Sequence, residues 1–122
     1  MKFIGIDGLG ASGKTELAKR IAAKLGPPHG EASNVTIIHT DDFYKPIEER
    51  TIGLVPEIIS PDFDWDRLER EVFQKKHDVT VIVVGVYALQ KRFRKYYDYS
   101  IWVDAPRHIR IARMIKREGE AV

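Results

Sequence analysis

The chain contains no cysteine among its 122 residues. That absence excludes disulfide bonds, thiolate zinc sites and thiol catalysis, and it fits a reducing compartment. No apolar run approaches the ~20 residues that a bilayer-spanning helix needs, and the N-terminus lacks the basic, apolar and small-residue order of a secretion signal. We therefore expect a cytoplasmic protein with no membrane partner.

An excess of charge of either sign is also missing. The formal net charge is +2, with 31% charged and 43% hydrophobic residues, a composition typical of an ordinary globular domain. Near-balanced charge gives no global argument for a nucleic-acid partner. We expect one domain over residues 1–122 with no nucleic-acid partner, and the composition leaves homo-oligomerisation open.

Short apolar runs alternate along the chain with amphipathic stretches. The apolar runs predict strands, and the middle two are apolar on both alternations, so we expect helices to cover both their faces. Trp65 and Trp102 lie in apolar segments and are predicted to be core residues. The alternation is typical of an α/β fold with a parallel sheet flanked by helices. The predicted strands are 2–7, 35–39, 80–84 and 99–104, and the predicted helices are 14–26, 60–74, 90–97 and 106–118.

The first predicted strand runs into GLGASGKT, which we call the phosphate loop (residues 8–15). It matches G-x-x-x-x-G-K-[ST], with a strand before it and a helix after it. Its glycines let successive N–H groups turn inward around a phosphate, and the helix adds its positive end. This chemistry assigns Lys14 to the β- and γ-phosphates and the Thr15 hydroxyl to Mg²⁺. The predicted nucleotide-binding residues are Gly8, Leu9, Gly10, Ala11, Ser12, Gly13, Lys14 and Thr15.

A second polar segment, HTDDFYKP, begins where the second predicted strand ends. Ligands of open parallel sheets bind beyond the carboxyl ends of the strands, so we expect Asp41 and Asp42 to face the γ-phosphate. Phosphoryl transfer needs a carboxylate near the acceptor oxygen, a role suited to Asp41. Asp42 fits an acceptor contact or a hydrogen bond within its own turn. Tyr44 fits the wall of the acceptor pocket or packing on the sheet edge.

The last predicted helix carries arginines at spacings of three, three and four, which places them on one stripe opposite its isoleucines. Such a stripe fits either a lid over a nucleotide or a solvated face. The absence of interleaved aromatic residues argues against nucleic-acid binding through it. The four arginines are Arg107, Arg110, Arg113 and Arg117.

Five segments in order, GLGASGKT, TDDFYKP, PDFDWDRL, VGVYAL and IWVDAPRHIRIARMIKRE, resemble the uridine kinase and phosphoribulokinase-like group of P-loop kinases over nearly the whole chain. The resemblance implies a P-loop NTPase-type sheet, ATP and Mg²⁺ as cofactors, and phosphorylation of a hydroxyl on a nucleoside, sugar phosphate or related small molecule. It also implies roles for particular residues. These are Lys14, Asp41 and Arg117 in catalysis, Asp41 with Thr15 at the metal, Arg113 on ATP, and Asp42, Tyr44 and Tyr87 at the acceptor.

The sequence departs from that family at three places. Val84 stands where members carry a carboxylate before the glycine of VGVYAL, only a few residues near 75–78 replace a substrate-binding hairpin, and members continue beyond the MIKREG segment. We therefore expect a compact or incomplete form of the fold. Two functions stay open: an active small-molecule kinase, or a nucleotide-binding regulatory relative without turnover. If Val84 faces the metal, Val84→Glu should raise turnover or lower the Mg²⁺ requirement.

Overall fold

The computed structural model describes residues 2–26, 34–43 and 63–120, with side chains through residue 116. Within these ranges, strands β1 (Phe3–Gly8), β2 (Val35–His39), β3 (Thr80–Val84) and β4 (Tyr99–Val103) form one sheet in the order β2-β3-β1-β4. Every neighbouring pair is parallel. The predicted α/β fold with a parallel sheet is confirmed, and each predicted strand matches an observed one to within one residue at either end.

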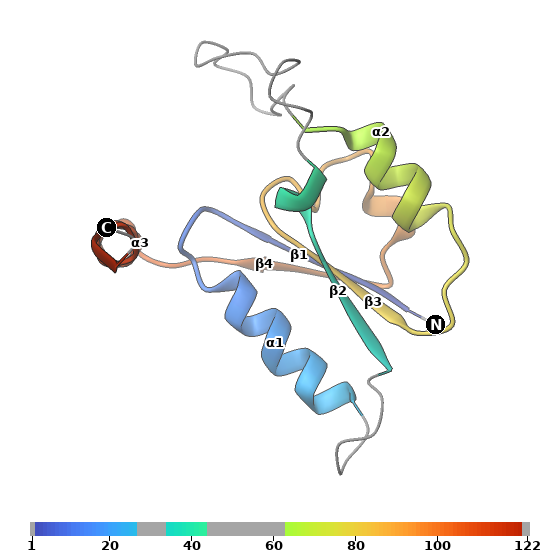
Figure 1. The fold of residues 1–122 in the computed structure, drawn as a ribbon, viewed down its shortest axis with the longest axis horizontal. Coiled ribbons are helices and arrows are strands. Elements are labelled where there is room, and N and C mark those ends of the chain that lie inside the picture. The colour runs from blue at the N-terminus through green and yellow to red at the C-terminus, as the bar shows by residue number, and fades with distance from the viewer. Residues whose placement is uncertain (1, 27–33, 44–62, 121–122) are drawn as a thin grey trace.

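Helices cover both faces of this sheet (Figure 1). Helix α1 (Lys14–Leu25) lies on one face, and α2 (Trp65–Leu68) lies on the other and continues as the π-helical turn η3 (Glu69–Phe73). Helix α3 (Arg107–Glu120) stands beyond the carboxyl end of β4, next to the loop that joins β1 to α1. Two short 3₁₀ helices, η1 (Thr40–Phe43) and η4 (Arg94–Tyr96), complete the elements used below.

The prediction of a helix over residues 90–97 is wrong. The segment forms successive turns, in which Phe93 N–H donates to Gln90 O and Tyr96 N–H donates to Phe93 O, and only η4 is helical. The turns direct its aromatic rings onto Phe73 of η3, with centroid distances of 4.8 Å to Phe93, 4.8 Å to Tyr96 and 5.4 Å to Tyr97. Tertiary packing of these rings therefore overrides the helical pattern of the segment.

Alternate residues of the two central strands enter two separate cores. Phe3 and Val81 belong to an aromatic-rich cluster with Phe73 and Phe93, whereas the next residues along each strand belong to a cluster with Ala18 of α1. The prediction that both faces are covered therefore holds for β3. It holds in part for β2, where Ile37 packs against the cluster with Ala18 and Ile38 packs against the aromatic-rich cluster. No residue of β2 is fully buried, because the strand lies at the sheet edge beside β3 alone.

The two tryptophans differ in environment. Trp65 is 8% exposed and belongs to the aromatic core, as predicted. The prediction for Trp102 is wrong, because its side chain is 57% exposed on β4, the opposite edge strand of the sheet. Among the described helices, none has the length and apolar composition required to cross a membrane.

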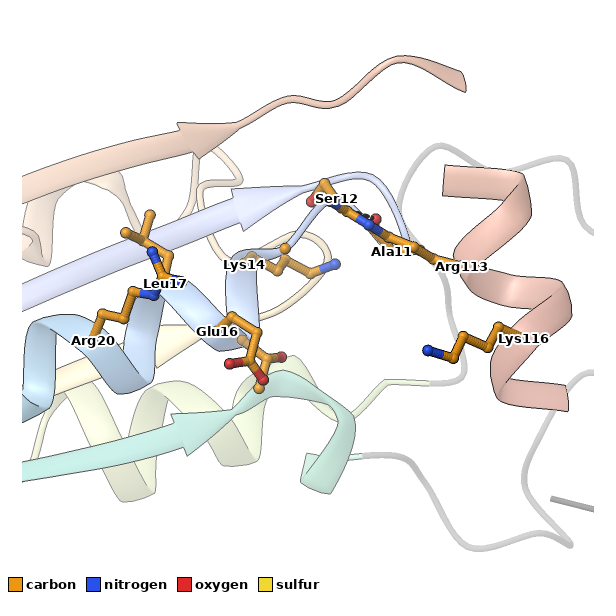
Figure 2. Close-up of a pocket in the computed structure, with 10 residues that line it drawn as sticks. Ala11, Ser12, Lys14, Glu16, Leu17, Arg20, Arg113 and Lys116 are labelled. Carbon is orange, nitrogen blue, oxygen red and sulfur yellow. Dashed lines mark hydrogen bonds between the residues drawn. The ribbon is translucent and has the colours of Figure 1, made fainter. Parts of the chain in front are cut away.

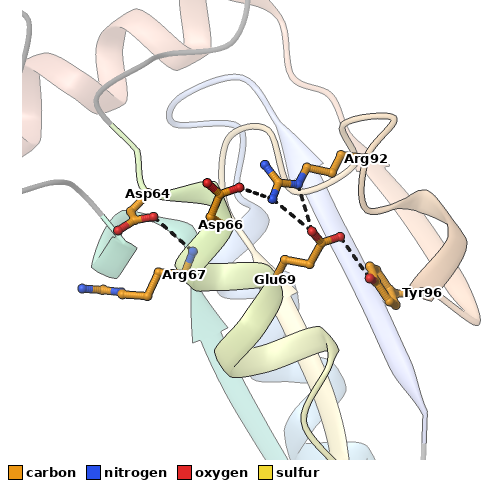
Figure 3. A network of polar contacts seen from close by, with 6 residues as sticks. All are labelled: Asp64, Asp66, Arg67, Glu69, Arg92 and Tyr96. Atoms are coloured by element: carbon orange, nitrogen blue, oxygen red, sulfur yellow. Dashed lines mark hydrogen bonds and ion pairs between the residues drawn. The ribbon is translucent and has the colours of Figure 1, made fainter.

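A polar network on the surface ties α2 and η3 to the turns over residues 90–97 (Figure 3). Arg92 forms ion pairs with Asp66 and with Glu69, the latter at 3.0 Å, and the Tyr96 hydroxyl donates to Glu69 Oε2 at 3.0 Å. Burial alone would raise the pKa of Glu69, but the hydrogen bonds from Arg92 and Tyr96 and the charges of Arg92 and Lys95 lower it below its usual value. The network therefore stabilises the fold through the ionised form of Glu69.

We predict that Glu69→Gln lowers the free energy of unfolding by about 1 kcal/mol at pH 7. Because the folded-state pKa of Glu69 is lowered, this contribution is present above its unfolded value of about 4.3 and is lost as pH falls through the folded value. Urea unfolding of both proteins between pH 3 and pH 7 measures the difference. Glu71→Gln is the matched control, since Glu71 forms only an exposed pair with Arg67 at 3.7 Å. A difference that stays constant with pH would contradict the assignment.

Candidate active site

The phosphate loop leaves the end of β1 and enters α1 through a sharply turned backbone. Ala11 has φ 62° and Gly13 has φ 99°, both in the left-handed region, and Ser12 N–H donates to Leu9 O at 3.2 Å. Gly13 is the N-cap of α1, and no side chain among the described residues caps the helix there. The first N–H groups of α1 are therefore available to an anion.

Gly8 is required by close packing at the start of this loop. A Cβ at Gly8 would lie 2.4 Å from the Val103 carbonyl oxygen and 2.8 Å from Ser12 Oγ. Any side chain here would push the loop away from the end of β4. The loop therefore lies directly against the strand that leads to α3.

Lys14 and Thr15 occupy the first turn of α1, as the motif predicts. The Lys14 ammonium group reaches back over the loop and donates to Leu9 O at 3.2 Å, and Thr15 is exposed at the surface. Figure 2 shows the Lys14 side chain extending from α1 toward the loop. An ammonium group in that position can move onto a phosphate oxygen bound in the loop.

Helix α3 packs on the phosphate loop through Arg113 and Met114. Arg113 Nη1 donates to Ala11 O at 3.0 Å, and the Met114 methyl group would lie 3.1 Å from a Cβ at Gly10. Arg110 instead donates to Ala105 O at the start of its own helix. The structure thus brings Arg113 to the predicted nucleotide site, whereas the side chain of Arg117 lies outside the described residues.

A pocket of about 740 Å³ lies between the phosphate loop, α1 and α3. This volume is within the range of small-molecule sites. Its lining includes four cationic residues, Lys14, Arg20, Arg113 and Lys116, against one acidic residue, Glu16. Figure 2 shows Lys116 extending from α3 toward α1. The pocket therefore suits a polyanion.

Sequence reasoning missed two cationic residues of this pocket, Arg20 and Lys116. Lys116 lies one turn after Arg113 on α3, and Arg20 lies on α1 five residues after Thr15. Helical spacing from Arg113 could have found Lys116. A spacing of five residues does not put Arg20 on the same helix face as Thr15, so only the structure brings Arg20 to the pocket.

Asp41 and Asp42 lie in η1, at the carboxyl end of β2, and both side chains are exposed. The element is fixed to the start of α2, since Arg67 Nη2 donates to Asp42 O at 2.7 Å and Asp64 N–H donates to Phe43 O at 2.6 Å. Parallel topology puts η1 at the same edge of the sheet as the phosphate loop. Neither aspartate lines the described pocket, so the structure does not bring Asp41 and Asp42 into the lining that contains Lys14 and Thr15.

Tyr87 lies in the turn after β3 and faces the start of α2. Its ring packs edge-on against Phe63 and Trp65, with centroid distances of 6.2 and 6.0 Å. The backbone of Tyr87 has φ 65°, an unfavourable conformation for a bulky residue. Tyr44, the other tyrosine predicted at the acceptor, lies outside the described residues.

The described residues contain no group of three or more acidic or histidine side chains that could hold a metal ion. Mg²⁺ commonly keeps several waters and takes its remaining oxygen ligands from one or two protein groups and from substrate phosphates. Thr15 and Asp41, both exposed at the carboxyl edge, supply oxygen donors that fit this mode of binding.

Val84 does not lie on the open edge of the site. It is 1% exposed and belongs to the same cluster as Ala18 and Ile6, on the face of the sheet that α1 covers. A carboxylate at this position would be buried among apolar side chains. The expected gain from Val84→Glu therefore has to overcome a desolvation cost.

Searches against known proteins found relatives that are kinases. The chain is 33% identical to a cytidylate kinase of Pyrococcus horikoshii, 28% identical to one of Natronomonas pharaonis, and 26% identical to a uridine kinase of Schizosaccharomyces pombe. Each alignment covers 97 or 98% of this chain, but 59%, 60% and 32% of those relatives in the same order. The chain therefore spans about three fifths of the cytidylate kinases and about a third of the uridine kinase. No protein-family model matches it.

A solved structure from Silicibacter sp. TM1040, named as a fructose transport system kinase, superimposes with a TM-score of 0.72 at 20% identity. The match covers 98% of this chain and 73% of that one, and it supports the fold. Together with the phosphate loop and the parallel sheet, these likenesses support a relationship to P-loop kinases, among them uridine and cytidylate kinases.

We predict that Val84→Glu lowers the free energy of unfolding by about 3 kcal/mol, because a carboxylate replaces a methyl-bearing side chain in the core. Denaturant unfolding at pH 7 measures it. Thr36→Glu is the matched control, since Thr36 is exposed on β2 of the same sheet, and we expect it to stay within about 0.5 kcal/mol of the original protein. A fully stable Val84→Glu protein would show that this position can open toward the site.

Proposed function

We propose that the chain is an ATP-dependent kinase that transfers the γ-phosphate of ATP to a hydroxyl group of a small molecule, such as a nucleoside or a sugar phosphate. The observation that carries the proposal is the cationic pocket built on the phosphate loop, where the uncapped start of α1, Lys14 and Arg113 meet. The names of the nucleoside and nucleotide kinases among its relatives support the same class of reaction.

Each residue has a separate part in this reaction. The N–H groups of the loop and of α1 hold the phosphates, and Lys14 exchanges Leu9 O for a phosphate oxygen. Arg113 exchanges Ala11 O for the γ-phosphate, where its guanidinium group offsets the charge of the transition state. Mg²⁺ bound by Thr15 and Asp41 would neutralise charge on the β- and γ-phosphates.

Asp41 acts on the acceptor. Its carboxylate orients the hydroxyl group and takes the proton as the oxygen bonds to phosphorus, while the bond to the β-phosphate oxygen breaks and ADP leaves. The exposure of Asp41 on η1 leaves it accessible to a substrate. Asp42 and Tyr87 flank the acceptor in this arrangement, with Tyr87 anchored by Trp65.

A second function, nucleotide binding without turnover, is favoured by Val84, because this buried valine supplies no carboxylate to the site. It shares the phosphate site with the kinase but predicts no product with any acceptor. An ADP-release assay across nucleosides, nucleoside monophosphates and ribose phosphates separates the two functions.

Lys14→Ala should weaken Mg-ATP binding by about tenfold or more while the fold is kept, because a charge-assisted contact to phosphate is lost from a half-buried surface position. Isothermal titration calorimetry measures affinity, and circular dichroism reports the fold. Lys19→Ala removes a lysine that pairs only with exposed Glu16 on the same helix, and it should bind as the original protein does. Equal affinity in all three proteins would contradict the assignment of nucleotide binding to the phosphate loop.

Asp41→Asn should bind Mg-ATP nearly normally but lose roughly 10²- to 10⁴-fold in kcat with an active acceptor. Steady-state kinetics with the acceptor found in the ADP-release assay measures it. Asp42→Asn is the neighbouring control and should keep a larger share of kcat. If Asp41→Asn retains most of the rate and Asp42→Asn does not, the catalytic base is Asp42.

A further inference from the structure

Asp7 is a buried carboxylate that the reaction above does not use. It is 6% exposed and lies in β1 directly before the phosphate loop. Its two oxygens accept hydrogen bonds from different parts of the chain: Oδ1 from Gly8 N–H at 2.6 Å, and Oδ2 from Leu89 N–H at 2.9 Å. One rigid carboxylate thus joins the start of the phosphate loop to the turn after β3.

The groups around Asp7 hold that turn from two sides. Tyr97 donates its hydroxyl hydrogen bond to Ala88 O at 2.7 Å, next to the Leu89 N–H that Asp7 accepts. Burial, with the charge of Asp7 added, raises the pKa of Tyr97, so the phenol stays a neutral donor. Asp7 and Tyr97 therefore hold the two ends of a single peptide group, the one that joins Ala88 to Leu89.

The same turn contains an unfavourable backbone conformation at Tyr87. The left-handed backbone of Tyr87 costs on the order of 1 kcal/mol or more and persists only where its surroundings hold it. Its carbonyl oxygen accepts from Gln90 N at 3.2 Å and from Gln90 Nε2 at 3.0 Å. The Tyr87 ring packs edge-on against Trp65, so the turn that contains Leu89 also contacts α2.

We propose that Asp7 is a positioning residue that couples occupancy of the phosphate loop to the placement of Tyr87 and Trp65. This inference rests on the proposed function, since it assumes that the loop binds the phosphates of ATP. A shift of the loop on phosphate binding moves Gly8 N–H, and the carboxylate transmits the shift to Leu89 through its second oxygen. Phosphate binding at the loop thereby determines the positions of Tyr87 and Trp65 at the proposed acceptor surface.

An asparagine cannot replace this carboxylate. An amide has one acceptor oxygen, and its NH₂ group would face an N–H donor, so one of the two backbone bonds must break. Asp7→Asn therefore breaks the hydrogen-bonded link between the phosphate loop and the turn after β3, while it keeps nearly the same side-chain shape.

Trp65 reports on the coupling. In a Trp102→Phe background it is the only tryptophan of the chain. Trp102 is exposed on the edge strand β4 and pairs in register with Asp7, so this substitution removes a second emitter beside the carboxylate. We would titrate this protein with a non-hydrolysable ATP analogue and Mg²⁺, following Trp65 emission, and measure binding by calorimetry in parallel. We expect a saturable emission change at the affinity found by calorimetry.

The variant and its control are made in the same background. Asp7→Asn should still bind the analogue in calorimetry but lose most of the emission change. Asp98→Asn is the matched control, because Asp98 Oδ2 accepts from Phe3 N–H at 2.8 Å at the opposite end of β1, and this variant should keep the full response. An Asp7→Asn protein that binds and responds like the control overturns the coupling.

A second readout needs no substitution and stands even if Asp7→Asn does not fold. The analogue should slow hydrogen exchange at the Leu89 amide, measured by NMR, because that amide is tied to the loop through Asp7. Failure of the analogue to bind in calorimetry would contradict the proposed function and the coupling with it. Binding with unchanged Trp65 emission and unchanged Leu89 exchange would overturn the coupling alone.

Discussion

Burial of β1 along its whole length, between β3 and β4, fixes where the carboxyl edge of the sheet begins. Its last residue, Gly8, touches the end of β4 so closely that a side chain would not fit. The phosphate loop therefore starts against β4, and the helix that follows β4 can reach that loop through Arg113. Strand burial thus determines the position of both the anion cradle and the cationic helix beside it.

Much of this arrangement could be predicted because it is local in sequence. The phosphate loop, the strand before it and the helix after it are adjacent, so their spacing alone defines the cradle. The arginine stripe of α3 follows from helical periodicity, and Arg113 lies where that periodicity places it. Parallel topology then follows from the alternation of apolar runs and helices.

What could not be predicted depends on contacts between distant segments. The apolar sequence of β2 and the apolar sequence neighbours of Trp102 are typical of core segments. Only the strand order shows that both lie at sheet edges. The segment around Phe93 has a helical sequence pattern, but its backbone forms turns and its aromatic rings pack on Phe73. The roles of Asp7 and Val84 depend on which face of the sheet each side chain enters, which requires the register of neighbouring strands.

In the function proposed above, the pocket between the phosphate loop and α3 binds a nucleoside triphosphate through its phosphates. Amide chemical shifts of ¹⁵N-labelled protein, recorded with Mg-ATP and separately with adenosine, test it most directly. We expect Mg-ATP to shift the amides of residues 9–15 and those around Arg113, and adenosine at the same concentration to leave the amides of the phosphate loop unchanged. Equal shifts with both ligands, or Mg-ATP shifts confined to residues away from this pocket, would contradict it.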